Sequence, residues 1–258
     1  PRFVAGDVGP TNKTCSMSPD VSNPAAREIT YDELFTDVCE QVDGLIEGGA
    51  DVILIETIFD TLNCKAMIDA ARTMMKRHGV ELPVMISLTV SDLAGRTLSG
   101  QTVDAFLASL SPYPIFSVGM NCAFGAPQMK PFIEHMAQVA PYYISAHPNA
   151  GLPNEMGEYD ETAESMAPQI AEFIDEGIVN IIGGCCGTSP EFIAHYARIA
   201  EGKKPHQVVE KPKYMWLSGL DLLQVDDSVH LPVDASRFVN VGERCNVAGS
   251  RKFLRLIN

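Results

Sequence analysis

Three cysteines stand where two apolar segments of the chain end. Cys185 and Cys186 are adjacent, follow the apolar run 178–182, and have glycines on both sides. Cys122 ends a second apolar run, 115–120, with one residue between them. Thiolates are common zinc ligands, and three protein ligands leave one corner of the zinc tetrahedron open. We therefore predict that Cys122, Cys185 and Cys186 bind one zinc ion, on which a substrate thiol would lose its proton and become a nucleophile.

The two segments must present these sulfurs at one place. Each segment is predicted to be a strand, and its cysteine stands at the carboxyl end, the edge at which barrels of alternating strands and helices place their chemistry. Adjacent residues of an extended strand point to opposite faces, so a metal shared by the cysteine pair needs a bend in the backbone. Gly183, Gly184 and Gly187 permit that bend.

Other interpretations of these cysteines are open. Cys122 alone could be a small buried apolar side chain. The adjacent pair could form a strained disulfide or a redox switch. The flanking glycines and the second strand-end cysteine favour the metal. The remaining cysteines have no ligand-like spacing: Cys15, Cys39, Cys64 and Cys245.

Apolar runs alternate with amphipathic segments through most of the chain. Strands are predicted at 3–10, 51–58, 83–90, 115–122, 142–147 and 178–185. Helices are predicted at 30–49, 60–79, 102–110, 127–139, 162–176 and 188–200, with capping boxes Thr30–Glu33 and Thr188–Glu191 starting the first and the last. This alternation predicts an α/β fold of the (β/α)8 TIM-type barrel class. Because only six units are found, we expect the barrel to lack its first two βα units.

The composition excludes several classes of protein. The formal net charge of −14 argues against nucleic acid or an anionic membrane as a partner. The sequence has no run of 18 apolar residues, and we expect no signal peptide. Seven cysteines in 258 residues is an odd number and fits a reducing compartment. We expect a cytoplasmic protein.

Two more strand ends carry polar residues. Glu56 interrupts the apolar strand 51–58. Because an unpaired buried carboxylate is costly, Glu56 should either face the strand-end cavity or form an internal ion pair. His147 and Asn149 follow another strand, and for His147 a hydrogen-bonded role in the loop is favoured over zinc ligation.

The motif GGCCGT around the cysteine pair, together with NCAFG at 121–125, resembles the zinc-dependent homocysteine S-methyltransferase family over residues 1 to about 202. In that family the cysteine of the NCAFG motif and both cysteines of the GGCCGT motif bind zinc. The resemblance implies that homocysteine is the substrate, that Glu56 binds its amino group, and that Asn149 contributes to the substrate site. The family's opening Asp-Gly segment is not found. The resemblance therefore implies a truncated homocysteine-binding barrel, inactive by itself.

Further segments resemble the cobalamin-dependent methionine synthase branch of this family. They are 98–102 and 146–153. Residues 237–258 resemble the start of a pterin-binding domain, with the first strand of a second barrel at 237–246 and the beginning of a helix at 250–254. Residues 203–236 read as an interdomain linker, mostly irregular up to Pro232, with apolar residues from Tyr214 onward packing back on the barrel. Glu243 and Asn246 match pterin-site positions of the family, although capping of a strand-to-helix turn explains them equally well.

The resemblance implies methyl transfer to the zinc-bound thiolate of homocysteine, which gives methionine. The donor would be methylcobalamin, held by a module of the same full-length polypeptide outside this chain, and methyltetrahydrofolate would be the ultimate methyl source. The alternatives are a homocysteine methyltransferase that uses betaine or S-methylmethionine, and a non-catalytic zinc-binding or redox-sensing domain.

Overall fold

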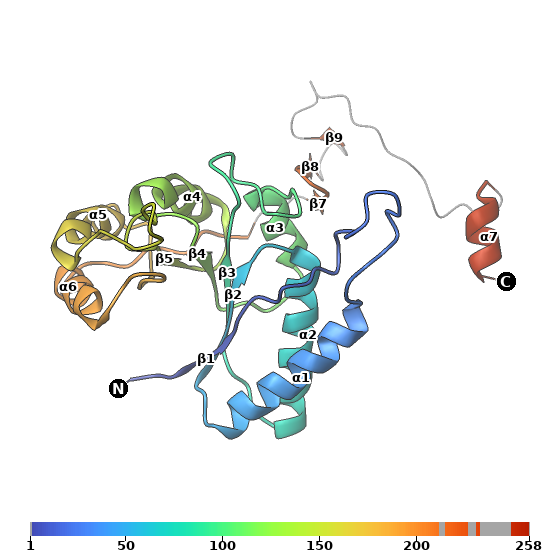
Figure 1. The fold of residues 1–258 in the computed structure, drawn as a ribbon, viewed down its shortest axis with the longest axis horizontal. Helices are drawn as coiled ribbons and strands as arrows, with labels where there is room; N and C mark the ends of the chain where they lie inside the picture. Colours follow the sequence, from blue (N-terminus) through green and yellow to red (C-terminus); the bar gives the residue numbers. More distant parts are fainter. Residues whose placement is uncertain (1, 212–214, 227–230, 233–248, 258) are drawn as a thin grey trace.

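The main body of the protein is a curled half-barrel of six parallel strands with helices packed along it (Figure 1). The computed structural model describes residues 2–211, 215–226, 231–232 and 249–257. The six strands lie side by side in chain order: β1 (Ala5–Val8), β2 (Val52–Ile58), β3 (Val84–Leu88), β4 (Ser117–Asn121), β5 (Tyr143–His147) and β6 (Ile181–Ile182). The helices that connect or follow them are α1 (Tyr31–Glu47), α2 (Thr61–His78), α3 (Val103–Leu110), α4 (Ala126–Val139), α5 (Ala163–Asp175) and α6 (Pro190–Ala200).

This order confirms the predicted alternation of strands and helices. Parallel neighbours in chain order place every carboxyl strand end on the same edge of the sheet. Cys122, which directly follows β4, and the cysteine pair, which follows β6, therefore lie on one edge.

The two faces of the sheet differ in chemistry. Paired residues of neighbouring strands share a face, and one face carries apolar side chains that are fully buried under the helices: Ile53, Ile55, Ile86, Val118 and Ile144. The opposite face is more polar and includes Asp7, Ser87, Gly119, Asn121 and Ser145. The half-barrel thus has an apolar outer layer and a polar inner face.

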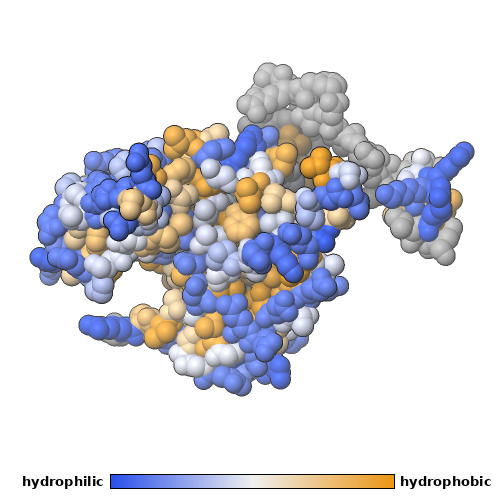
Figure 2. Space-filling view, viewed as in Figure 1, coloured by the Kyte–Doolittle hydropathy of each residue, from blue (hydrophilic) through white to orange (hydrophobic). Residues whose placement is uncertain are grey.

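The edge strand β1 leaves apolar side chains in contact with solvent. Phe3 and Val4, just before it, are 75% and 63% exposed, and apolar side chains gather near the N-terminal end in the space-filling view (Figure 2). No helix within the described ranges is both long and apolar enough to cross a membrane.

Helix starts follow the sequence signals at one predicted box and depart from them at the other. At α1 the Thr30 side chain accepts from the Glu33 amide, and the Glu33 carboxylate accepts from the Thr30 amide, which confirms the capping box. The box predicted at Thr188–Glu191 is wrong. The N-cap of α6 is Ser189, which makes no side-chain capping bond, and the Thr188 hydroxyl donates to the Cys185 carbonyl at 2.7 Å.

Strand β6 is shorter than predicted. The sequence indicates 178–185, but the ladder covers Ile181 and Ile182 only. Its later start has a physical reason in Asn180, whose side-chain oxygen accepts from the Ile144 amide at 2.8 Å in the place of a backbone carbonyl.

The predicted irregular linker contains a small antiparallel sheet, which corrects that prediction. Its strands are β7 (Met215–Ser218), β8 (Leu222–Asp226) and β9 (Leu231–Pro232). Trp216 packs against the main core, as expected of this segment, whereas Leu217 and Leu220 are 48% and 59% exposed. After it, helix α7 (Arg251–Ile257) corresponds to the helix expected at 250–254, and the strand predicted at 237–246 lies outside the described residues.

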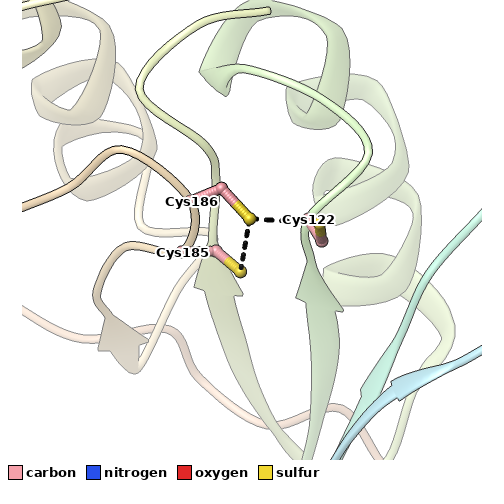
Figure 3. Close-up of side chains that lie close together, drawn as sticks. All are labelled: Cys122, Cys185 and Cys186. Carbon is pink, nitrogen blue, oxygen red and sulfur yellow. Dashed lines mark hydrogen bonds between the residues drawn. The ribbon is translucent and has the colours of Figure 1, made fainter. Parts of the chain in front are cut away.

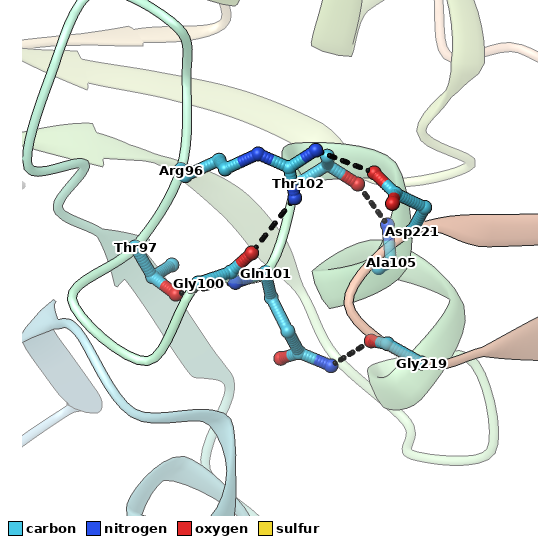
Figure 4. A network of polar contacts seen from close by, with 8 residues as sticks. All are labelled: Arg96, Thr97, Gly100, Gln101, Thr102, Ala105, Gly219 and Asp221. Atoms are coloured by element: carbon cyan, nitrogen blue, oxygen red, sulfur yellow. Dashed lines mark hydrogen bonds and ion pairs between the residues drawn. The ribbon is translucent and has the colours of Figure 1, made fainter.

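The turn between β7 and β8 is fastened to the loop that leads from β3 into α3 (Figure 4). The Gln101 side chain donates to the Gly219 carbonyl at 2.7 Å, and the Thr102 amide donates to the Leu220 carbonyl at 2.9 Å. Arg96 forms an ion pair with Asp221 at 2.8 Å. The hairpin is therefore attached at the same edge of the sheet as the cysteines.

Candidate metal centre

The structure brings the three predicted cysteines together. The Cys186 sulfur lies 3.7 Å from that of Cys122 and 3.9 Å from that of Cys185, and all three sulfurs are within 4.8 Å of one another (Figure 3). Cys122 comes from the loop after β4, and the other two come from the loop between β6 and α6. Residues 64 positions apart in the chain thus form one sulfur cluster.

The spacing of the sulfurs fits a tetrahedral zinc ion. With Zn–S bonds of about 2.3 Å, the sulfurs at two corners of a tetrahedron are about 3.8 Å apart. The two sulfur distances of 3.7 and 3.9 Å match this value. Cys186 is exposed and the other two cysteines are partly exposed, so a fourth ligand could approach from solvent.

The backbone at Cys122 adopts an unusual conformation. Cys122 and Ala123 have φ angles of 60° and 59°, in the left-handed region that non-glycine residues seldom occupy. The Cys122 amide donates to the His147 carbonyl at 3.3 Å, and the Phe124 amide donates to the Cys122 carbonyl at 2.6 Å. Such conformations persist only where the surroundings enforce them, and they cluster at functional sites.

The loop of the cysteine pair turns at Gly187. This residue has a φ of +80°, and a Cβ atom on it would stand 2.5 Å from the Tyr159 Cβ. Only glycine fits, as expected of the glycine bracket. The Cys185 amide donates to the Pro148 carbonyl at 3.0 Å, so the turn is held against the loop after β5.

Asn149 lies in the same arrangement and is 3% exposed. Its side-chain oxygen accepts from the Cys186 backbone amide at 3.1 Å, while its backbone amide donates to the Phe124 carbonyl at 2.9 Å. Asn149 therefore joins the two cysteine loops, and its contact with a substrate stays a prediction.

The sulfurs have unequal affinities for protons. A hydrogen bond from the Cys185 thiol lowers the pKa of Cys122 to about 5, well below its usual range. Burial, the second largest cause, acts in the opposite direction. The same hydrogen bond, together with burial, raises the pKa of Cys185. A thiolate is the form that binds metal, so a hydrogen bond that lowers the pKa of one thiol of the cluster favours metal binding.

Glu56 stands at the end of β2 beside this cluster. It is partly buried, and burial, then the charge of Asp7, then that of Cys122 raise the pKa of its carboxyl group. None of the ion pairs within the described ranges includes Glu56, which removes the internal ion pair as an explanation. Glu56 is thus a carboxylate among negative charges at the strand-end edge.

Sequence reasoning missed Asn121, which is fully buried at the end of β4. Its side-chain oxygen accepts from the Thr57 amide at 3.0 Å and from the Ser87 hydroxyl at 2.7 Å. Its side-chain nitrogen donates to the Thr57 hydroxyl at 2.7 Å and lies 3.7 Å from the Cys185 sulfur. A polar residue that ends a buried strand directly before a ligand cysteine was the available signal.

The other predicted site residues have different outcomes. His147 is mostly buried, its pKa is lowered by burial, and its backbone carbonyl rather than its ring makes the contact to the Cys122 loop. The Cys185 and Cys186 sulfurs are too far apart for a disulfide, whose length is about 2.05 Å. Glu243 and Asn246 lie outside the described residues.

The comparison with protein families decides what kind of domain this is. The model of the family described as "Homocysteine S-methyltransferase" matches residues 1–200. The chain belongs to this family. The matched residues include all six strands of the half-barrel and both loops that carry the cysteines.

Solved structures of a bacterial homocysteine methyltransferase share this fold. The homocysteine methyltransferase MmuM from Escherichia coli in its apo form matches with a TM-score of 0.56 and 21% identity, over 76% of this chain and 62% of that one. The metallated form of the same protein matches with a TM-score of 0.55 and 20% identity, over 76% and 61% of the two chains. This homocysteine S-methyltransferase family member thus spans about 62% of the length of the structure that it resembles.

Proposed function

We propose that the chain binds zinc through Cys122, Cys185 and Cys186 and forms the part of a methyltransferase that presents homocysteine for methylation at sulfur. The observation that carries the proposal is the sulfur spacing of 3.7 and 3.9 Å, which suits a tetrahedral ion with one corner free. Family membership supplies the substrate class.

Each residue has a definite task in this proposal. The thiolate at Cys122 and the thiols of the pair provide three sulfur ligands on loops that Asn149 and Gly187 hold in place. When bound, zinc would keep the homocysteine sulfur deprotonated at neutral pH and so make it a nucleophile. The exposed side of Cys186 leaves room for that sulfur to enter.

Glu56 is proposed to bind the amino group of homocysteine. Burial, followed by the charges of Asp7 and Cys122, raises the pKa of its carboxyl group, so part of this shift reflects negative charge around the carboxylate. An ammonium group would offset this repulsion and favour the ionised carboxylate. Asn149 is proposed to contact the substrate from the opposite loop.

The methyl donor is the finer part of the proposal. We assign methylcobalamin as donor and methyltetrahydrofolate as ultimate methyl source, because segments 98–102, 146–153 and 237–258 resemble the methionine synthase branch. In this assignment residues 1–202 form the homocysteine-binding barrel, 203–236 the linker, and 237–258 the start of the pterin-binding domain with Glu243 and Asn246. Adding methylcobalamin, betaine or S-methylmethionine separately to the full-length protein, and measuring methionine, discriminates among the donors.

X-ray absorption at the zinc edge, with and without homocysteine, tests the central proposal. We expect one zinc per chain, with three sulfur ligands rising to four when homocysteine is added and remaining three when homoserine is added. Cys122→Ser should lower the sulfur count by one, whereas the matched control Cys39→Ser, on α1, should leave it unchanged. Four protein ligands that homocysteine does not alter would contradict the proposal and favour a structural zinc or redox domain.

A further inference from the structure

Asn121 uses its entire hydrogen-bonding capacity inside the protein. A primary amide has two lone pairs to accept and two hydrogens to donate. The Asn121 oxygen accepts from the Thr57 amide and the Ser87 hydroxyl, and its nitrogen faces the Thr57 hydroxyl and the Cys185 sulfur. Because an amide N–H such as that of Thr57 can only donate, the oxygen must face it, and the side chain has a single orientation.

The hydrogen bonds from Asn121 to Thr57 stabilise a strained bulge in β2. The pairing of β2 with β3 shifts register between Ile55 and Ile58, and Thr57 within this bulge has a φ of 57°. A β-branched residue in the left-handed region is disfavoured, so something must hold it there. Asn121 binds both polar groups of Thr57, its amide and its hydroxyl. Glu56 is the residue immediately before Thr57 and lies within the same bulge.

The other end of the network reaches the sulfur cluster. The Asn121 nitrogen lies 3.7 Å from the Cys185 sulfur, within hydrogen-bonding range for sulfur, and Cys122 is the next residue in the chain. Asn121 is 0% exposed, so water does not compete for these contacts. A single buried amide therefore connects the Glu56 bulge to two of the three sulfurs.

We propose that Asn121 is a positioning residue that sets the separation between the Glu56 carboxylate and the metal-binding sulfurs, and so selects thiols that carry an amino group at the distance found in homocysteine. This inference rests on the proposed function, since it takes Glu56 as the amino-group site. It adds the residue that makes the two halves of the substrate site act together. Asn121 itself touches neither the substrate nor the methyl group.

Two thiols separate this role from a general structural one. Homocysteine and 4-mercaptobutyrate have the same thiol and carboxylate, but only the first has the amino group. Their dissociation constants are measured on the cobalt-loaded chain through the thiolate-to-cobalt absorption, which also reports how many sulfurs bind the metal. The native protein should bind homocysteine about tenfold or more tightly than 4-mercaptobutyrate, the contribution of one charged hydrogen bond. Removal of the Asn121 side chain should abolish this preference.

In Asn121→Ala, we expect that preference to fall to about the value of Glu56→Gln, while the absorption of three cysteine thiolates persists. Metal affinity should fall by about 10–100-fold, as it does when a group that orients a ligand is removed. A variant that binds both thiols more weakly by the same factor would overturn the proposal, and so would an unchanged preference.

Thr57→Val decides the question if Asn121→Ala does not fold. This variant removes one hydroxyl, while the size of the side chain and the hydrogen bond from the backbone amide to Asn121 are kept. We therefore expect a partial loss of the preference for homocysteine. A full preference would count against the proposal. The matched control is Ser145→Ala. It removes a buried hydroxyl from the same inner face that has no hydrogen-bond partner among the described residues, and it should preserve the preference.

The failure of the proposed function has a separate signature. It would show in the native protein, as absence of cobalt binding or as equal affinity for the two thiols that Glu56→Gln leaves unchanged, and it would overturn both proposals. Failure of the present inference alone would show as a normal preference in the native protein that Asn121→Ala retains.

Discussion

Gly119 is the position at which one added methyl group should disconnect the sulfur cluster. It lies on β4, pairs with Ser145 on β5, and precedes Cys122 by three residues. A Cβ atom on Gly119 would stand 1.8 Å from the Ser145 carbonyl oxygen, whereas real Cβ atoms essentially never come closer than 3.0 Å to such neighbours. Because the obstacle is backbone in a close-packed interior, the two strands must separate by at least about 1.2 Å.

The size of that movement sets the expected loss. Metal sites require ligand distances within about 0.2 Å of their usual values, so a shift of about 1 Å at β4 moves the Cys122 sulfur out of bonding range. In Gly119→Ala we expect zinc affinity to fall by about 100-fold or more, the upper end of the effect of disturbing groups around a metal. Overpacking should also cost about 1–3 kcal/mol of stability, which lowers the melting temperature by about 3–10 °C.

The assay is competition for zinc with a chromophoric chelator, alongside a thermal melt followed by circular dichroism. The matched control is Gly44→Ala in α1, where the new methyl group meets nothing within 4 Å. That control should preserve zinc affinity and raise stability by up to about 1 kcal/mol. Native zinc affinity in a folded Gly119→Ala protein would refute the reasoning, because the strands would then have yielded without moving Cys122.

Three further predictions concern stability and pH. Asp60→Ala should cost about 2–4 kcal/mol in urea unfolding, because this buried carboxylate caps α2 through the Leu62 amide and also accepts from the Ser16 amide; Asp60→Asn, which keeps an acceptor, should cost less. The hydrogen bond to Asp104 raises the pKa of His135, so His135→Gln should destabilise the protein below about pH 6.5, and the difference should vanish as the pH rises through the raised pKa, as melts from pH 5.5 to 9 would test. Zinc must displace the proton of Cys185, because the pKa of this thiol is raised. Zinc affinity, measured by chelator competition, should therefore rise by about tenfold per pH unit for that proton. An affinity independent of pH between 6 and 8 would contradict this prediction.

The metal cluster could be predicted because its signals are local. A buried strand is recognisable from a short run such as 178–182, and parallel topology places all such strand ends together. A cysteine at each of two ends, one in a glycine-rich turn, is then enough to bring the sulfurs to one edge. The capping box at Thr30 was predictable for the same reason, since both partners lie within four residues.

Features that depend on distant contacts could not be predicted. Thr57 and Asn121 are 64 residues apart in the chain, so the sequence does not show that they interact or that Thr57 is strained. The box at Thr188 failed for a different, local reason: its hydroxyl donates to the carbonyl of Cys185, three residues earlier, and Ser189 is the N-cap of α6. The β7–β8 hairpin was missed because its turn lacks a strong two-residue signal and its stability comes from the loop before α3.

The attachment of that hairpin has a kinetic consequence. Gln101 and Arg96 bind the turn at Gly219 and Asp221, so this part of the chain is held at the edge of the sheet that carries the sulfurs. A group tethered downstream meets that edge at an effective concentration set by the length of the tether, in the millimolar range for a short flexible one. Loosening the hairpin would lengthen the tether and lower that effective concentration.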